Sequence, residues 1–162
     1  MNSDSDNRHD LAFWLRVWWP VVIWIGIIAL ESTALFGANE TSRPLRWVYQ
    51  GLFGPVTDAN WAEIHHYIRK SGHFLGYGMI GLAWLRAWWM MLPRSGFIVD
   101  ALLAVLGTGL IASADEFHQS FLPNRTGMTS DVLLDCFGAV LLQLLVYLFI
   151  RAFRPNRLVK VA

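Results

Sequence analysis

Residues 136–150 read CFGAVLLQLLVYLFI, fifteen consecutive residues without a charge, bounded by Asp135 and Arg151. Three further blocks of 14 or 15 uncharged residues cover positions 17–30, 71–85 and 101–114. A helix of 14 residues is about 21 Å long, whereas the hydrocarbon core of a membrane is about 30 Å thick. Four helices that are apolar all round need more protein around them than a chain of 162 residues can provide, so the blocks indicate membrane spans.

The composition of the whole chain favours the same class. Hydrophobic residues make up 55% and charged residues 15%, against about 25% charged in an ordinary soluble domain. The net charge of +1 excludes a nucleic-acid binder that relies on a large basic excess. Cys136 is the only cysteine, which excludes a disulfide framework and a thiolate metal site. We therefore expect an all-α integral membrane bundle with no nucleic-acid partner.

The spans must extend past the charges that bound the blocks. We expect four transmembrane helices at about residues 12–33, 70–92, 97–118 and 131–151, between an N-terminal tail of residues 1–11 and a basic tail of residues 152–162. The long side chains of Arg16, Arg86 and Arg151 can snorkel to the interface. Asp115 and Asp135 are too short to do so, and they must face a protein interior or a wet cavity.

The distribution of lysine and arginine predicts the orientation. One side of the membrane would hold eight of them: Arg8, Arg16, Arg86, Arg94, Arg151, Arg154, Arg157 and Lys160. The other side would hold five: Arg43, Arg46, Arg69, Lys70 and Arg125. Both termini are therefore expected in the cytoplasm. The outer side would also carry eight acidic residues, which gives it a net charge of −3.

The longest connection, residues 34–69, is expected to lie outside. It is too apolar for a flexible linker, and Leu45 to Phe53 reads as a short helix in the outer interface, bounded by Pro44 and Gly54. Asn60 to Arg69 is expected to be helical and to run into the second span. Gly72 and Gly76 form a G-x-x-x-G pattern, which predicts close helix packing there.

Polar residues gather at the outer ends of the last three spans. Lys70, His73 and Tyr77 have the spacing i, i+3, i+7 and share one helix face. Asp131, Asp135 and Gly138 share another face. The sequence therefore predicts a small outward-facing pocket, with candidate ligand-binding residues Lys70, His73, Tyr77, Asp115, Glu116, Gln119, Arg125, Asp131 and Asp135.

Three stretches of this constellation resemble the VanZ-like family of bacterial membrane proteins. They are KSGHFLGY (residues 70–77), DEFHQSFLPNR (residues 115–125) and DVLLDCFGA (residues 131–139). The resemblance covers roughly residues 15–150 and implies a multi-pass protein of the bacterial inner membrane. Asp135 departs from the pattern, because the family usually carries Asn there. The founding member is linked to low-level resistance to the glycopeptide teicoplanin, and the resemblance implies no particular reaction.

Four functions remain open at this point. The charges could form an ion-paired clamp between helices, or a pocket for an anionic lipid or an undecaprenyl-linked envelope precursor. An enzyme could use Asp115, Glu116 and His73 as acid–base groups on a lipid-linked or phosphorylated substrate. Transport is the fourth reading. A metal variant of the enzyme would use His66, His73, Glu116 and Asp131, but no strong metal motif is present, so no metal and no cofactor are expected.

Overall fold

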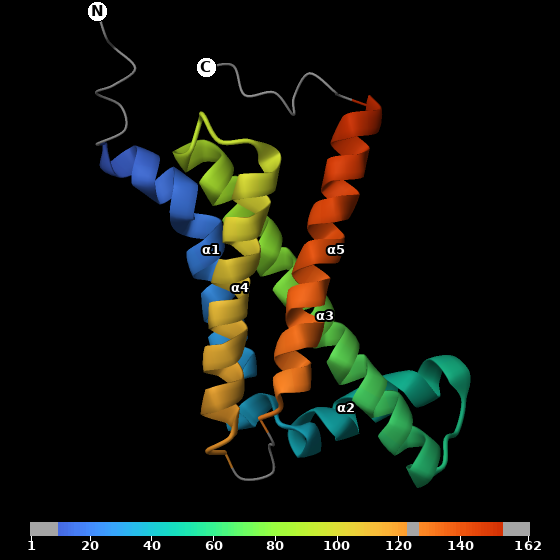
Figure 1. Ribbon diagram of the computed structural model, residues 1–162. Helices are drawn as coiled ribbons and strands as arrows, with labels where there is room; N and C mark the ends of the chain where they lie inside the picture. Colours follow the sequence, from blue (N-terminus) through green and yellow to red (C-terminus); the bar gives the residue numbers. More distant parts are fainter. Residues whose placement is uncertain (1–9, 123–126, 154–162) are drawn as a thin grey trace, which may run out of the picture.

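The structure, a computed structural model, describes residues 10–122 and 127–153. These residues form five α-helices, one short 3-10 helix and no strands, which confirms the predicted all-α class. The elements are α1 (Leu11–Glu31), η2 (Ala34–Phe36), α2 (Ala38–Phe53), α3 (Asp58–Met91), α4 (Phe97–Gln119) and α5 (Thr129–Phe153). Figure 1 shows α3 crossing the bundle as its central element, in contact with α1, α2, α4 and α5.

Three helices in the described part of the chain, α1, α4 and α5, are long and apolar enough to cross a membrane. Their bounds differ from the predicted spans by one or two residues at most ends. The remaining predicted span, residues 70–92, lies within α3, which is not among these three. Its glycines and tryptophans, together with His73 and Arg86, lower the mean hydropathy of this segment of α3. The number of spans therefore stays a prediction.

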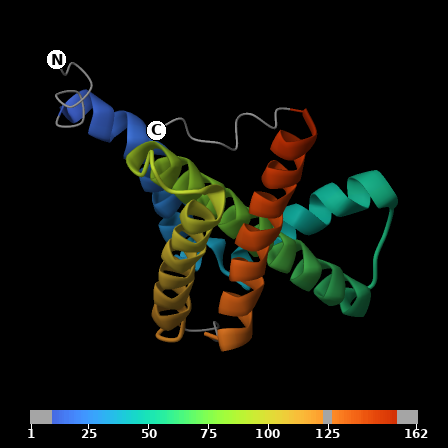
Figure 2. The same ribbon diagram turned by 45° about the horizontal axis from the view of Figure 1, so that its top comes forward.

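The first residue of α1 and the last residue of α5 lie at one end of the bundle, and α2 lies at the other, as Figures 1 and 2 show. α2 lies against the N-terminal part of α3. Two small apolar clusters join α1 to the bundle. One is formed by Val17, Val21, Ala83 and Ala87, and the other by Ile28, Tyr77, Ile80 and Ala112.

Pro20 lies inside α1 and leaves a backbone carbonyl without its helical donor. Proline has no N–H, so the carbonyl of Arg16, four residues earlier, loses its partner. The guanidinium of Arg86 donates to this carbonyl at 3.0 Å and to that of Val17 at 3.1 Å. Arg86 was expected to snorkel to the interface. In the structure Arg86 ties α3 to α1, because the proline leaves an acceptor within its reach.

The helix predicted for residues 45–53 is longer than expected and continues through Pro44. Its N-terminal half is held on α3 by two contacts that precede the proline. The indole N–H of Trp61 donates to Ser42 Oγ at 2.8 Å, and His65 Nε2 lies 3.1 Å from Thr41 Oγ1. These contacts offset the one backbone hydrogen bond that Pro44 removes.

His65 is a neutral anchor between α2 and α3. Its ring is buried and stacks on Trp61 with a centroid distance of 5.5 Å. Burial, and next to it the charge of Arg69, lowers the pKa of His65 below its usual value. The hydroxyl of Thr41 donates to the carbonyl of Gly37, so the ring Nε2 of His65 is the donor to Thr41.

Close packing of α3 on α5 occurs at other glycines than Gly72 and Gly76. A Cβ on either of those two would meet nothing within 4 Å, so the prediction of close contact was wrong there. A Cβ on Gly138 would lie 2.3 Å from the carbonyl oxygen of Phe74, and one on Gly81 would lie 2.6 Å from the Cβ of Ala139. The close approach of the two helices therefore runs from Phe74 to Gly81 of α3, on a different face of this helix from Gly72 and Gly76.

Candidate polar site at one end of the bundle

The predicted polar residues come from α3, α4 and α5 and meet in the half of the bundle that also carries α2 (Figure 1). In that half α4 is ending and α5 is beginning. The side chains pair between helices in three separate groups. Each group joins one residue of the Lys70, His73, Tyr77 face to a carboxylate on α4 or α5.

The first group is the ion pair of Lys70 and Asp131. The Lys70 Nζ contacts Asp131 Oδ1, and both side chains are partly buried. Ser130 also donates to the same oxygen at 3.3 Å. This pair ties the start of α5 to α3.

We expect Lys70→Met to lower the free energy of unfolding by about 1–2 kcal/mol, because the partly buried Asp131 carboxylate loses its cation. The double variant Lys70→Met/Asp131→Leu should recover most of this loss, since it leaves no unpaired charge. Chemical unfolding of the purified protein in detergent measures both. Arg43→Met, at an exposed position on α2, is the control and should change little. A double variant as unstable as Lys70→Met would show that the pair acts as a clamp.

The second group is built around Asp115, which is buried near the end of α4. Its Oδ2 accepts hydrogen bonds from the hydroxyl of Tyr77 at 2.8 Å and from Gln119 Nε2 at 2.9 Å. Tyr77 is almost fully buried, and Gln119 lies one helical turn after Asp115. The other oxygen, Oδ1, is buried and has no hydrogen-bond partner within residues 10–122 and 127–153. The described residues therefore hold Asp115 through one of its two oxygens.

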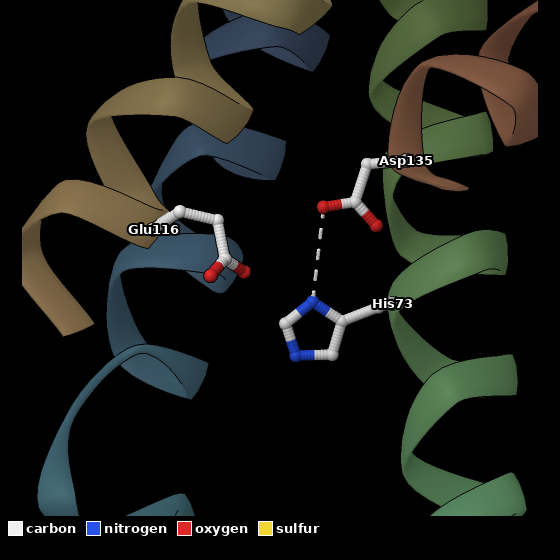
Figure 3. Close-up of side chains that lie close together, drawn as sticks. All are labelled: His73, Glu116 and Asp135. Atoms are coloured by element: carbon white, nitrogen blue, oxygen red, sulfur yellow. Dashed lines mark ion pairs between the residues drawn. The ribbon is translucent and has the colours of Figure 1, made fainter. Parts of the chain in front are cut away.

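The third group consists of His73, Glu116 and Asp135, one from each of the three helices. Figure 3 shows that their side chains point toward one another. One nitrogen or oxygen atom from each of the three lies within 4.8 Å of the others. His73 Nδ1 is 3.9 Å from Asp135 Oδ2, which is an ion-pair distance and too long for a hydrogen bond. Asp135 is fully buried, whereas His73 is partly exposed.

Gly127 and Met128, which precede α5, contact Glu116 of the third group. Glu116 Oε2 accepts the backbone N–H of Met128 at 2.8 Å. Gly127 passes so close to the end of α4 that a Cβ there would lie 2.2 Å from the carbonyl oxygen of Glu116. Arg125, a predicted ligand-binding residue between α4 and α5, lies outside the described residues.

A groove of about 150 Å³ opens beside His73. It lies between the end of α1, η2, α2 and α3, and its lining is both charged and apolar: Glu31, Phe36, Thr41, Leu45, Ile68, Arg69, Gly72 and His73. His73 belongs to the groove and to the carboxylate cluster, so it connects the two. The groove passes over Gly72, which explains why a Cβ on this residue would meet nothing within 4 Å.

The residues proposed for a metal variant do not gather. His66 is exposed and packs edge-on against Tyr67, and Asp131 pairs with Lys70. Adjacent helical residues point about 100° apart, so His66 and His65 cannot both follow the face of His73. Asp135 takes the place of His66 and Asp131 beside His73 and Glu116.

Sequence reasoning did not single out Arg69 as a site residue, and it left open whether Glu31 joins the site. Both line the groove with His73. The position of Arg69, four residues before His73 on one helix face, was the available signal.

The fold and the site together define an all-α membrane protein with a cluster of buried carboxylates at one end of its bundle. The pattern of the VanZ/LLP1 family matches residues 17–151, most of the chain, and the chain therefore belongs to this family. Searches of curated proteins and of solved structures each found no match.

Proposed function

We propose that this protein binds the polar head group of an anionic lipid or a lipid-linked envelope precursor, such as an undecaprenyl-linked one, in the groove beside His73. The observation that carries the proposal is the mixed lining of this groove. Arg69, Glu31 and His73 offer polar contacts, while Phe36, Leu45 and Ile68 offer an apolar wall. A molecule with a polar head and an apolar tail matches such a lining.

The size of the groove supports a head group rather than a whole ligand. Its volume of about 150 Å³ is smaller than the roughly 300–1,000 Å³ of pockets that enclose drug-sized molecules. A phosphate or a similar group fits this space, and the rest of a lipid would remain outside. Arg69 supplies a planar, permanently charged guanidinium of the kind that holds phosphate oxygens.

The proposed topology has four spans, with α3 as the fourth, both termini in the cytoplasm and the polar site on the outer side of a bacterial inner membrane. The charge distribution of the sequence and the family assignment support it. Exposed Trp47, Leu52 and Phe53 on α2 suit a helix that lies in the outer interface, next to the groove. Binding of an envelope precursor would connect the protein to envelope or glycopeptide-antibiotic responses.

Gly72→Leu is the decisive variant, because the new side chain would enter the groove without a steric clash in the bundle. We expect native mass spectrometry to show a retained anionic lipid on the wild type. Retention should fall about tenfold or more in Gly72→Leu, which corresponds to about 1.4 kcal/mol or more of binding free energy.

Gly76→Leu is the matched control. It lies on the same helix and also has open space around it, but it does not line the groove. It should retain lipid as the wild type does. Equal loss in both variants, or no retained anionic lipid on the wild type, would reject the proposal.

Acid–base catalysis on a lipid-linked or phosphorylated substrate is the second candidate function. It is favoured by the position of His73, which lines the groove and faces the buried Asp135 carboxylate at 3.9 Å. The same mass spectra distinguish the two functions. A bound lipid phosphate that loses its phosphate on the wild type but stays intact on His73→Gln would support the enzyme.

A further inference from the structure

The carboxylate of Asp135 lacks the partners that a fully buried charge requires. Its relative exposure is 0%, and neither of its oxygens has a hydrogen-bond partner in the described part of the chain. Burying a carboxylate without hydrogen bonds is strongly destabilising unless a cation neutralises it. Among the described residues, the basic side chain within ion-pair distance is His73, whose Nδ1 is 3.9 Å away. This contact alone does not satisfy the two oxygens.

The neighbouring carboxylates add to the uncompensated negative charge around Asp135. Asp115 and Glu116 add two further buried carboxylates on the facing helix α4. Lys70, the lysine of this region, is already paired with Asp131. The described side chains around Asp135 therefore carry more negative than positive charge.

The geometry points to a divalent transition-metal ion bound by His73, Glu116 and Asp135, and we propose this site. Donor atoms of one such ion lie about 2.0–2.2 Å from it and thus about 3–4.4 Å from each other. The three donors lie within 4.8 Å of one another, so side-chain shifts on the order of 1 Å complete the set. Figure 3 shows the three side chains directed at the same space.

The donor set selects the class of ion. One imidazole and two carboxylates suit Zn²⁺ or Mn²⁺, since an imidazole ligand disfavours Mg²⁺ and Ca²⁺. The backbone N–H of Met128 holds Glu116 Oε2 at 2.8 Å and so orients this ligand from the second coordination shell.

Three protein ligands leave at least one coordination position open. Because His73 also lines the groove, the ion lies next to the space proposed for the head group. A phosphate oxygen can occupy the open position, which explains how an acidic site accepts an anionic ligand. This last step rests on the proposed function, whereas the metal site does not.

The test uses the full chain in detergent, stripped with EDTA and titrated separately with Zn²⁺ and Mn²⁺ in the absence of added lipid. Elemental analysis after gel filtration gives the stoichiometry, and calorimetry gives the Kd. We expect one ion per chain for at least one of the two metals. Asp135→Asn and Glu116→Gln should each raise the Kd about 100-fold or more, since changes outside the ligand shell already cost 10–100-fold.

Asp100→Asn is the matched control, because Asp100 is an equally buried carboxylate at the other end of α4, where Ser95 donates to it at 2.5 Å. This variant should bind the ion as the wild type does. Less than about a tenth of an ion per wild-type chain, or an unchanged Kd in both ligand variants, overturns the site. If the ligand variants do not fold, the Co²⁺-loaded wild type decides. Visible absorption bands from bound Co²⁺ support the site, and their absence overturns it.

The two proposals fail in different ways. Metal binding without lipid retention would leave the site in place and reject the head-group function. Lipid retention that EDTA does not change, on a wild type without metal, would reject the site and leave the proposed function in place.

Discussion

Gly138→Ala is expected to separate α3 from α5 and to lower the free energy of unfolding by about 3 kcal/mol. The added methyl group would lie 2.3 Å from the carbonyl oxygen of Phe74, a backbone atom that cannot rotate away. Helices in a membrane are held by close packing rather than by a hydrophobic driving force between them, so a forced separation weakens the whole contact. The loss is measured by unfolding the purified variant and the wild type in detergent with heat or denaturant.

Gly26→Ala provides the comparison for this prediction. Gly26 lies in α1, where a Cβ would have nothing within 4 Å. The free energy of unfolding of Gly26→Ala should be unchanged or raised by up to about 1 kcal/mol, because alanine is the better helix former. Similar stabilities for the Gly138 and Gly26 variants would contradict the close approach of α3 and α5.

Tyr77→Phe is expected to lower the free energy of unfolding by about 1.5–3 kcal/mol. The variant removes the hydroxyl that donates to Asp115 Oδ2 at 2.8 Å and leaves the rest of the ring in place. Asp115 Oδ1 has no hydrogen-bond partner among the described residues. Without the Tyr77 hydroxyl, Gln119 is therefore the one described residue that still donates to this carboxylate. Hydrogen bonds to charged groups cost more to lose than those between neutral groups.

Tyr147→Phe makes the same chemical change on α5, where the Tyr147 ring packs on Phe97 at 5.1 Å. It should alter stability by less than about 0.5 kcal/mol. A double-mutant cycle of Tyr77→Phe with Asp115→Asn isolates the interaction, and we expect a coupling energy above about 1 kcal/mol. Coupling near zero would show that the hydroxyl and the carboxylate do not depend on each other.

The all-α class and the positions of the long helices were predictable because charged residues bound each apolar block. The predicted span 97–118 corresponds to α4 at Phe97–Gln119, and 131–151 corresponds to α5 at Thr129–Phe153. The helix around Pro44 was less predictable. Its extent depends on Ser42 and Thr41, which contact residues about 20 positions away on α3. The residues around Pro44 do not by themselves indicate such long-range contacts.

The membership of the polar site was also visible in the sequence, since the spacing of Lys70, His73 and Tyr77 places them on one helix face. Their partners were not visible. The spacing is equally compatible with several pairings, and only the rotation and crossing of α3 relative to α4 and α5 assign Asp131, Asp135 and Asp115 to them.

The sequence by itself determined that this is a helical membrane protein of the VanZ/LLP1 family, and it indicated which residues are polar where lipid would exclude them. Tertiary structure decided what those residues do. It buried Asp135 without a hydrogen bond to any described residue, placed His73 between the carboxylates and a groove, and moved the close contact of the helices to Gly138. Hydrophobicity and periodicity are properties of one segment, whereas a pocket or a charge deficit depends on distances between segments that the chain brings together only when it folds.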